Sequence, residues 1–148
     1  DYHARLIETS GTINDSMPEY VVERVGDILN RFKKPLNGSK VLILGVAYKQ
    51  DIDDYRESPA IKVIELFNKR GSEIEYYDPY IKKYVYKGKS RSGLENLTAE
   101  DVKEQDIIVI LTAHTNVDYD LIQKNATVIF DAKNVTKALK NKDNIIVL

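Results

Sequence analysis

One stretch of twenty residues, from Lys40 to Pro59, constrains the fold more than any other part of the chain. It begins with four consecutive apolar residues, Val41 to Leu44, which run into Gly45. A short and continuously apolar run is typical of a strand that is buried on both faces of a sheet. The stretch ends in Ser58-Pro59, and a Ser N-cap followed by Pro favours the start of a helix. The pattern therefore predicts a buried strand, a loop and a helix.

Four later segments also have the composition of strands, and they point to a parallel sheet. Gly71 closes the helix that begins at Ser58-Pro59, and Thr98 opens another with the sequence Thr-Ala-Glu-Asp. We expect an α/β fold, a three-layer Rossmann-like domain with a mainly parallel sheet and a right-handed crossover. Residues 80–97 are polar and rich in tyrosine, and we expect an irregular loop with at most a short strand. The four predicted strands are 73–77, 106–111, 127–130 and 144–148.

The first 36 residues are predicted to form a helical region that precedes the α/β domain at 37–148. Residues 2–13 are weakly helical, and Ser16-Met-Pro-Glu19 matches the capping box that starts a helix. Tyr20 or residues 2–13 are expected to lie exposed. The apolar positions expected to pack on the α/β body are Val21, Val25, Ile28 and Phe32.

Composition excludes several classes of site. Of the 148 residues, 43% are hydrophobic and 30% are charged, with a net charge of −1, as is ordinary for one globular domain. The chain has no basic block and no long apolar stretch, so we expect neither a nucleic-acid partner nor a membrane span. It has no cysteine and only two distant histidines. The sequence therefore predicts no disulfide, no metal site and no cysteine nucleophile in this chain.

Two cations follow the first predicted strand. Lys49 and Arg56 lie in its loop, and ligands of open α/β sheets bind outside the carboxyl ends of the strands. An anionic ligand would therefore be held there. The alternatives are a solvated surface lysine and a local ion pair between Arg56 and a neighbouring acid. The segment from Lys49 to Glu57 contains four acids and two cations, so the loop is not a general phosphate cradle.

Two polar residues at strand ends have a structural interpretation. Asp78-Pro79 is first of all a turn signal. His114 is a lone histidine after a predicted strand, which favours a structural role over a catalytic one.

The stretch Lys40 to Pro59 resembles the C-terminal domain of the UDP-glucose/GDP-mannose dehydrogenase family. Further segments resemble the family's motifs in the family's order: Gly-Ser-Glu-Ile-Glu-Tyr-Tyr-Asp-Pro at 71–79, the segment 112–119, and Phe-Asp-Ala-Lys-Asn at 130–134. Residues 2–14 look like the end of the family's central helix. The sequence around residues 46–59 is most similar to the branch of UDP-N-acetylglucosamine and UDP-N-acetylmannosamine 6-dehydrogenases.

The resemblance implies roles for individual residues. The family oxidises a nucleotide-sugar at C6, from alcohol to carboxylate, with two NAD. Tyr48 and Lys49 match positions that bind the UDP-sugar substrate, and Arg56 matches the arginine that reaches NAD. Lys133 stands where relatives have an arginine that grips the nucleotide-sugar. A lysine keeps the charge there but loses the planar fork of the guanidinium.

Two features of the family are missing from this sequence. It has no G-x-G-x-x-G fingerprint and no cysteine, which the family carries in earlier parts of the enzyme. We therefore expect a fragment with no catalytic residue of its own, with NAD bound mainly by an N-terminal domain. The full protein is expected to be a cytoplasmic homodimer formed through the central helix. The alternative is a stand-alone nucleotide-binding or regulatory α/β module without catalysis.

Overall fold

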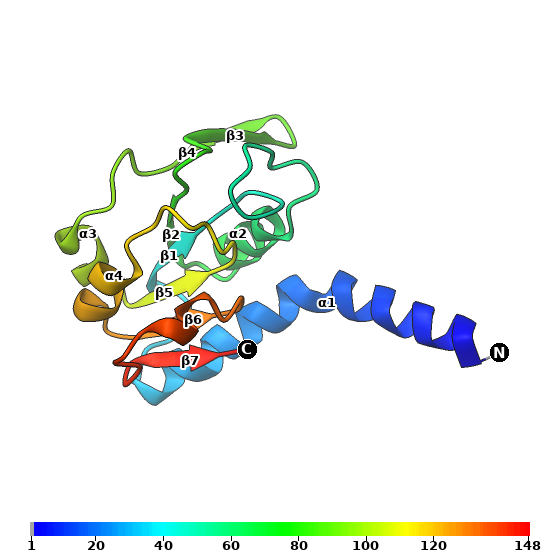
Figure 1. Ribbon diagram of the computed structural model, residues 1–148, viewed down its shortest axis with the longest axis horizontal. Coiled ribbons are helices and arrows are strands. Elements are labelled where there is room, and N and C mark those ends of the chain that lie inside the picture. The colour runs from blue at the N-terminus through cyan, green and yellow to red at the C-terminus, as the bar shows by residue number, and fades with distance from the viewer. Residues whose placement is uncertain (1) are drawn as a thin grey trace.

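A five-stranded parallel sheet lies at the centre of the structure, with the strand order β2-β1-β5-β6-β7 (Figure 1). The computed structural model describes the backbone of residues 2–148 and the side chains of residues 17–148. Each neighbouring pair of strands in the sheet is parallel, as predicted. The strands are β1 (Lys40–Leu44), β2 (Glu73–Tyr77), β5 (Ile107–Ile110), β6 (Ile129–Asp131) and β7 (Ile145–Val147).

Helices cover both faces of this sheet and give the predicted three layers (Figure 1). One apolar cluster joins the sheet to α1 (Tyr2–Arg31) and α2 (Pro59–Lys69). The second cluster joins it to α3 (Ala99–Lys103) and α4 (Tyr119–Asn125). All four residues of β5 are buried because this central strand is covered from both sides.

The helix α2 begins as the Ser-Pro signal predicts. The side chain of Ser58 accepts a hydrogen bond from the backbone N–H of Ala60, and Pro59 occupies the first turn. The helix buries one side, including Ile64 and Phe67, against the sheet. It ends before Gly71, whose φ of +83° and contact with Asn37 leave no room for a Cβ atom.

The predicted helix start at Ser16 is wrong, because α1 is one helix that runs through the Ser16–Glu19 segment. Pro18 lies inside the helix, where it removes one backbone hydrogen bond. The following turns are anchored by Val21 and Val25, which are buried against the α/β body, and this packing compensates for the loss.

The buried stripe of α1 differs from the prediction at one position. Ile28 is buried as expected and Leu29 is buried beside it, but Phe32 is 44% exposed. The reason is that α1 ends at Arg31, so Phe32 no longer follows the helical spacing. Tyr20 is 45% exposed, as predicted. The exposure expected for residues 2–13 concerns side chains outside the described part of the chain.

The segment 80–97 is more regular than predicted, because it contains an antiparallel hairpin. The hairpin consists of β3 (Lys83–Tyr86) and β4 (Lys89–Ser92), joined at Lys87-Gly88. Both turn residues have positive φ, which is what a type I′ hairpin turn requires. The inward side chain of Tyr84 is buried against Tyr76, with ring centroids 5.5 Å apart, and this contact ties the hairpin to the sheet.

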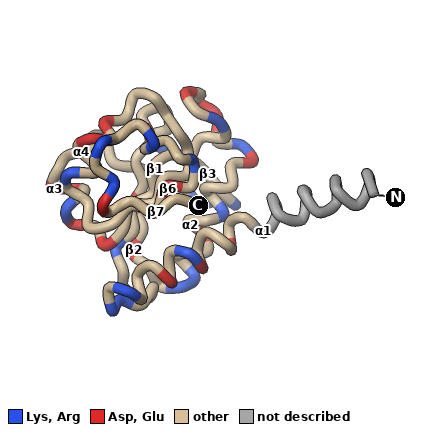
Figure 2. The backbone as a smooth tube through the Cα atoms, turned by 60° about the horizontal axis from the view of Figure 1, so that its bottom comes forward, with Lys and Arg blue, Asp and Glu red and all other residues tan. Residues whose placement is uncertain are grey.

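Charged residues of both signs are mixed over the surface of the α/β body, as Figure 2 shows. Among the described residues, no helix combines the length and the apolar character that crossing a membrane requires.

Candidate functional site

The strand order reverses between β1 and β5, and this point forms the candidate site. From β1 the chain continues to β2 on one side, and it later returns to β5 on the other side. The loops after β1 and β5 therefore diverge at the carboxyl edge, where ligands of doubly wound sheets bind. Gly45, with φ +89°, lets the two loops meet, since a Cβ atom there would lie 2.3 Å from Cβ of Thr112.

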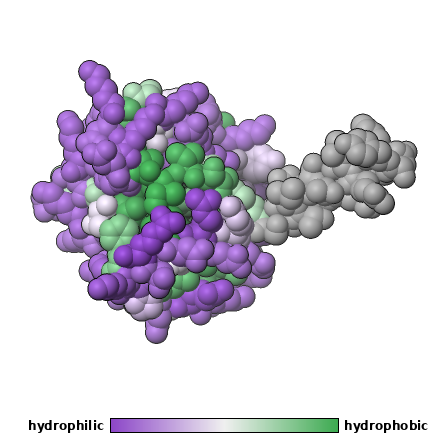
Figure 3. Space-filling view, turned by 90° about the horizontal axis from the view of Figure 1, so that it is seen from below, coloured by the Kyte–Doolittle hydropathy of each residue, from purple (hydrophilic) through white to green (hydrophobic). Residues whose placement is uncertain are grey.

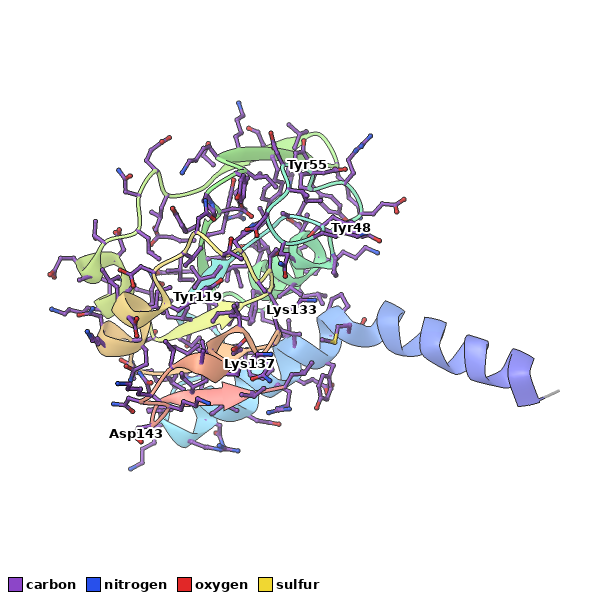
Figure 4. The ribbon with its side chains drawn as sticks, in the orientation of Figure 1. Tyr48, Tyr55, Tyr119, Lys133, Lys137 and Asp143 are labelled. Carbon is purple, nitrogen blue, oxygen red and sulfur yellow. The ribbon has the colours of Figure 1, made fainter. Side chains whose placement is uncertain are left out.

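A cavity of about 300 Å³ opens at this edge. It brings together three of the residues selected from the sequence: Tyr48 and Lys49 from the loop after β1, and Lys133 from the turn after β6. Figure 4 shows Tyr48 and Lys133 on the side of the sheet toward which the strands point. The other residues that line the cavity are Gln50, Leu111, Thr112 and Ala113.

The cavity is cationic and has one aromatic wall. Within residues 17–148, neither Lys49 nor Lys133 has a carboxylate within 4.0 Å, so both ammonium groups are available to an anion. Tyr48 is 50% exposed, and its ring centroid lies 5.9 Å from Nζ of Lys49. This arrangement can hold a phosphorylated ligand and pack a flat or sugar-like group beside it.

The turn that carries Lys133 is fixed from below by Asp131, which is fully buried. One oxygen of Asp131 accepts the backbone N–H of Lys133 at 3.0 Å. The other accepts the N–H of Thr136 at 2.9 Å and its hydroxyl at 2.6 Å. The side chain of Lys133 thus extends from a backbone that is held in place.

Arg56 does not line this cavity. Its guanidinium forms a two-pronged ion pair with Asp54, at 3.1 Å from Nε to Oδ1 and 3.0 Å from Nη2 to Oδ2. The local ion pair considered from the sequence is therefore present, and it lowers the pKa of Asp54. The Arg56 side chain is 84% exposed and borders a second cavity of about 250 Å³ beside Tyr55 and Val85.

Asp78, which the sequence suggests mainly as a turn residue, organises the loop after β1. One of its oxygens accepts the backbone N–H groups of Val46 at 2.9 Å and Ala47 at 3.1 Å. The other oxygen accepts the N–H groups of Tyr80 and Ile81. Burial would raise the pKa of Asp78, but the hydrogen bonds from His114 and the backbone amides lower it below its ordinary value.

His114 lies beneath the same loop, with only 1% of the residue exposed. Its Nε2 atom lies 2.9 Å from Asp78, and its Nδ1 atom accepts the backbone N–H of Asp51 at 2.8 Å. The sequence predicts a structural role for this histidine but not its partners. The available signal was that Asp78 and His114 both follow strands, whose carboxyl ends share one edge.

The described residues contain no group of three or more potential ligands that could hold a metal ion.

Comparison with known proteins identifies the domain. Residues 42–138, more than half of the chain, match the family model described as the UDP-glucose/GDP-mannose dehydrogenase family, UDP binding domain. The match includes Tyr48, Lys49, Arg56 and Lys133.

The relatives and similar structures agree with this match. The chain is 40% identical over 140 residues to the UDP-N-acetyl-D-mannosamine dehydrogenase of Methanocaldococcus jannaschii. The aligned region covers 95% of this chain and 28% of the relative. The structure of the UDP-N-acetyl-mannosamine dehydrogenase of Staphylococcus aureus matches with a TM-score of 0.71 and 34% identity, over 98% of this chain and 33% of that one.

A second solved structure, the UDP-D-ManNAc dehydrogenase of Pyrococcus horikoshii, matches with a TM-score of 0.76 and 28% identity, over 96% of this chain and 32% of that one. The chain thus spans about a third of the length of the relatives it matches. The predicted resemblance to the branch acting on UDP-N-acetylhexosamines is confirmed by these relatives. The chain belongs to the UDP-glucose/GDP-mannose dehydrogenase family and contains its UDP binding domain.

Proposed function

We propose that this chain is the substrate-binding part of an NAD-dependent UDP-sugar 6-dehydrogenase of the cytoplasm. The substrate is a UDP-N-acetylhexosamine, whose C6 alcohol the enzyme oxidises to a carboxylate. The observation that carries the proposal is the cavity at the strand-order reversal, lined by Tyr48, Lys49 and Lys133. The relatives named as UDP-N-acetyl-D-mannosamine dehydrogenases support the substrate class.

The cavity suits the diphosphate of such a substrate. Two lysines from separate loops face one space of about 300 Å³, and neither ammonium is neutralised by a described carboxylate. A charged hydrogen bond contributes about 1.5–3 kcal/mol where water is partly excluded. Lys49 and Lys133 therefore bind the phosphoryl groups, and the exposed ring of Tyr48 packs against the sugar part.

Arg56 has a different task in this proposal. Its guanidinium faces solvent beside a separate cavity, and a guanidinium suits a phosphate group. Arg56 contacts NAD. The cofactor is bound mainly by another domain of the enzyme, because this sequence has no dinucleotide fingerprint. NAD, when bound, supplies the acceptor for the hydride that leaves C6.

The division of the chain and its assembly complete the proposal. Residues 1–36 are the end of the central helical region, and residues 37–148 are the UDP-sugar-binding domain. The helical region forms the interface of a homodimer. Tyr20 and Phe32 support this, because both are large, exposed and belong to α1 or directly follow it. Figure 3 shows apolar residues gathered on the face that carries α1 and β7 in Figure 1.

Titration calorimetry with UDP tests the binding function in the purified 148-residue chain. We expect binding, and we expect Lys49→Ala to weaken it at least tenfold, which corresponds to about 1.4 kcal/mol. Lys124→Ala removes another exposed lysine, which lies on α4 and does not line the cavity, and should leave the affinity unchanged. Absence of UDP binding, or equal losses in the two variants, would contradict the proposal.

The same chain tests the absence of chemistry. With a UDP-sugar and NAD, we expect no NADH above background, because the chain has neither a cysteine nor the fingerprint. Turnover would show that catalytic groups lie on this domain after all.

A further inference from the structure

Three exposed residues of the cavity wall, 48–50, lie between two fixed points of the backbone. The first fixed point is Ala47. Its N–H donates to Asp78 at 3.1 Å, and its carbonyl accepts the hydroxyl of Thr112 at 3.0 Å. The second is Asp51, immediately after the exposed residues. The position of Lys49 is therefore set by what holds the backbone on either side of it.

Asp51 is held through both its backbone and its side chain. Its φ of +59° is a left-handed conformation that a residue other than glycine keeps only where its surroundings enforce it. The carboxylate accepts the N–H of Thr115 at 2.8 Å and its hydroxyl at 2.9 Å. The backbone N–H of Asp51 donates to Nδ1 of His114 at 2.8 Å. The loop after β1 is thus fastened to the loop after β5.

The two partners of His114 determine its tautomer. Nδ1 accepts from the N–H of Asp51, so the ring proton is on Nε2, which donates to Asp78. The ring of Tyr80 packs on the imidazole with centroids 5.0 Å apart, and the hydroxyl of Tyr119 donates to the backbone carbonyl of His114. An oriented imidazole therefore connects the end of β2 to the cavity loop.

We propose that His114 is a positioning residue, which fixes Lys49 at the cavity by accepting the Asp51 N–H at Nδ1. This inference rests on the proposed function, in which Lys49 binds the diphosphate. His114 itself does not line the cavity, so it acts through the backbone of Asp51, two residues from Lys49. A binding group on an ordered backbone loses less freedom when the ligand arrives, so the order of this loop contributes to affinity.

Two substitutions separate the two hydrogen bonds of the imidazole. His114→Asn places a polar atom where Nδ1 lies, so it can still accept the Asp51 N–H. His114→Gln reaches the position of Nε2, so it can still donate to Asp78 but no longer serves Asp51. By calorimetry with UDP, we expect the Gln variant to bind about tenfold more weakly and the Asn variant to stay within about threefold of the original chain.

A control separates positioning from general stability. Each His114 variant loses one hydrogen bond, the Gln variant to the N–H of Asp51 and the Asn variant to buried Asp78, so both should melt at lower temperature. Val102→Ala removes buried volume from α3, in the apolar cluster that joins α3 and α4 to the sheet, and should also lower the melting temperature. We expect this control to keep its UDP affinity. If affinity simply follows melting temperature across the three variants, His114 is only structural and the inference is overturned.

A measurement without UDP keeps the inference testable if the proposed function fails. Nitrogen-15 shifts of His114 should report the Nε2–H tautomer. Amide hydrogen exchange at Asp51 should be slow in the original chain and the Asn variant, and faster in the Gln variant. Absence of UDP binding by the original chain would defeat the proposed function alone. An Nδ1–H tautomer, or equal exchange in both variants, would defeat the positioning role alone.

Discussion

Lys49 and Lys133 line one cavity although the strands that precede them are not neighbours in the sheet. Strand β5 lies between β1 and β6, and its loop provides the wall between the two cations, from Leu111 to Ala113. A packed sheet, and not one flexible segment, therefore sets where the backbone places the two lysines. Two cations placed across a central strand match a ligand that carries charge on two phosphoryl groups.

Changing Lys133 tests the expectation, drawn from the family resemblance, that an arginine would serve at this position. Lys133→Ala should weaken UDP binding about tenfold, because one charged hydrogen bond is lost. Lys133→Arg should bind as tightly as the original chain or more tightly, because a guanidinium offers two parallel donors. Calorimetry with UDP measures both. A loss in the Arg variant as large as that in the Ala variant would show that the cavity cannot accept the fork.

Removing Arg56 should affect the cofactor and spare the substrate. In the enzyme that carries this domain, Arg56→Ala should raise the NAD concentration needed for half-maximal rate, because the guanidinium lies outside the lysine cavity. UDP affinity should change less than about twofold, which is under about 0.5 kcal/mol. Asp54→Asn is the matched control, since it weakens the ion pair and keeps the cation. Equal losses of UDP affinity in the Arg56 and Lys49 variants would contradict this division of tasks.

The parallel sheet could be predicted from the sequence because its signals are local and mutually consistent. The run Val41 to Leu44 needs cover on both faces, and Ser58-Pro59 supplies both a cap and a first turn. The continuous α1 could not be predicted in this way. Ser16–Glu19 fits a helix start and a helix interior equally, and the choice depends on the packing of later turns against the sheet.

Only part of the candidate site could be predicted from the sequence. Similarity to a known family singled out Tyr48, Lys49 and Lys133, and the strand order explains why they meet. The contacts beneath the cavity depend on where individual side chains point, which no spacing rule supplies. The bonds of His114 to Asp51 and Asp78 are of this kind.

Gly45 should be the least replaceable glycine of the site. Gly45→Ala combines a positive φ with a clash at 2.3 Å against Thr112, and should destabilise the chain by about 3 kcal/mol or more. Gly88→Ala is the control, because it has a positive φ of +77° but nothing within 4 Å of a new Cβ atom. Its cost should be about 1 kcal/mol. Chemical denaturation measures both, and equal losses would mean that the contact with Thr112 is readily relieved.

Acid should destabilise the chain partly through Asp78. The pKa of this buried carboxyl is lowered from its ordinary value of 3.8, since hydrogen bonds from His114 and the backbone outweigh the effect of burial. A lowered folded-state pKa means that ionised Asp78 stabilises the fold at pH values above the unfolded pKa. This stabilisation is lost as the pH falls through the folded-state pKa. Asp106 acts in the same direction. Burial would raise its pKa, but the hydrogen bonds from Lys34 and from a backbone N–H lower it.

Comparison with Asp78→Asn isolates this contribution. The variant offers one acceptor oxygen in place of two, and should be about 3 kcal/mol less stable at neutral pH. The difference in free energy of unfolding should stay constant from about pH 7 to pH 5 and shrink below about pH 4, because protonated Asp78 loses what the variant already lacks. Asp143→Asn, at an exposed position, is the control and should track the original chain. A difference that persists unchanged down to the lowest pH at which the chain folds would show that the charge of Asp78 contributes nothing, and that the shape of its hydrogen-bond network alone holds the loop after β1.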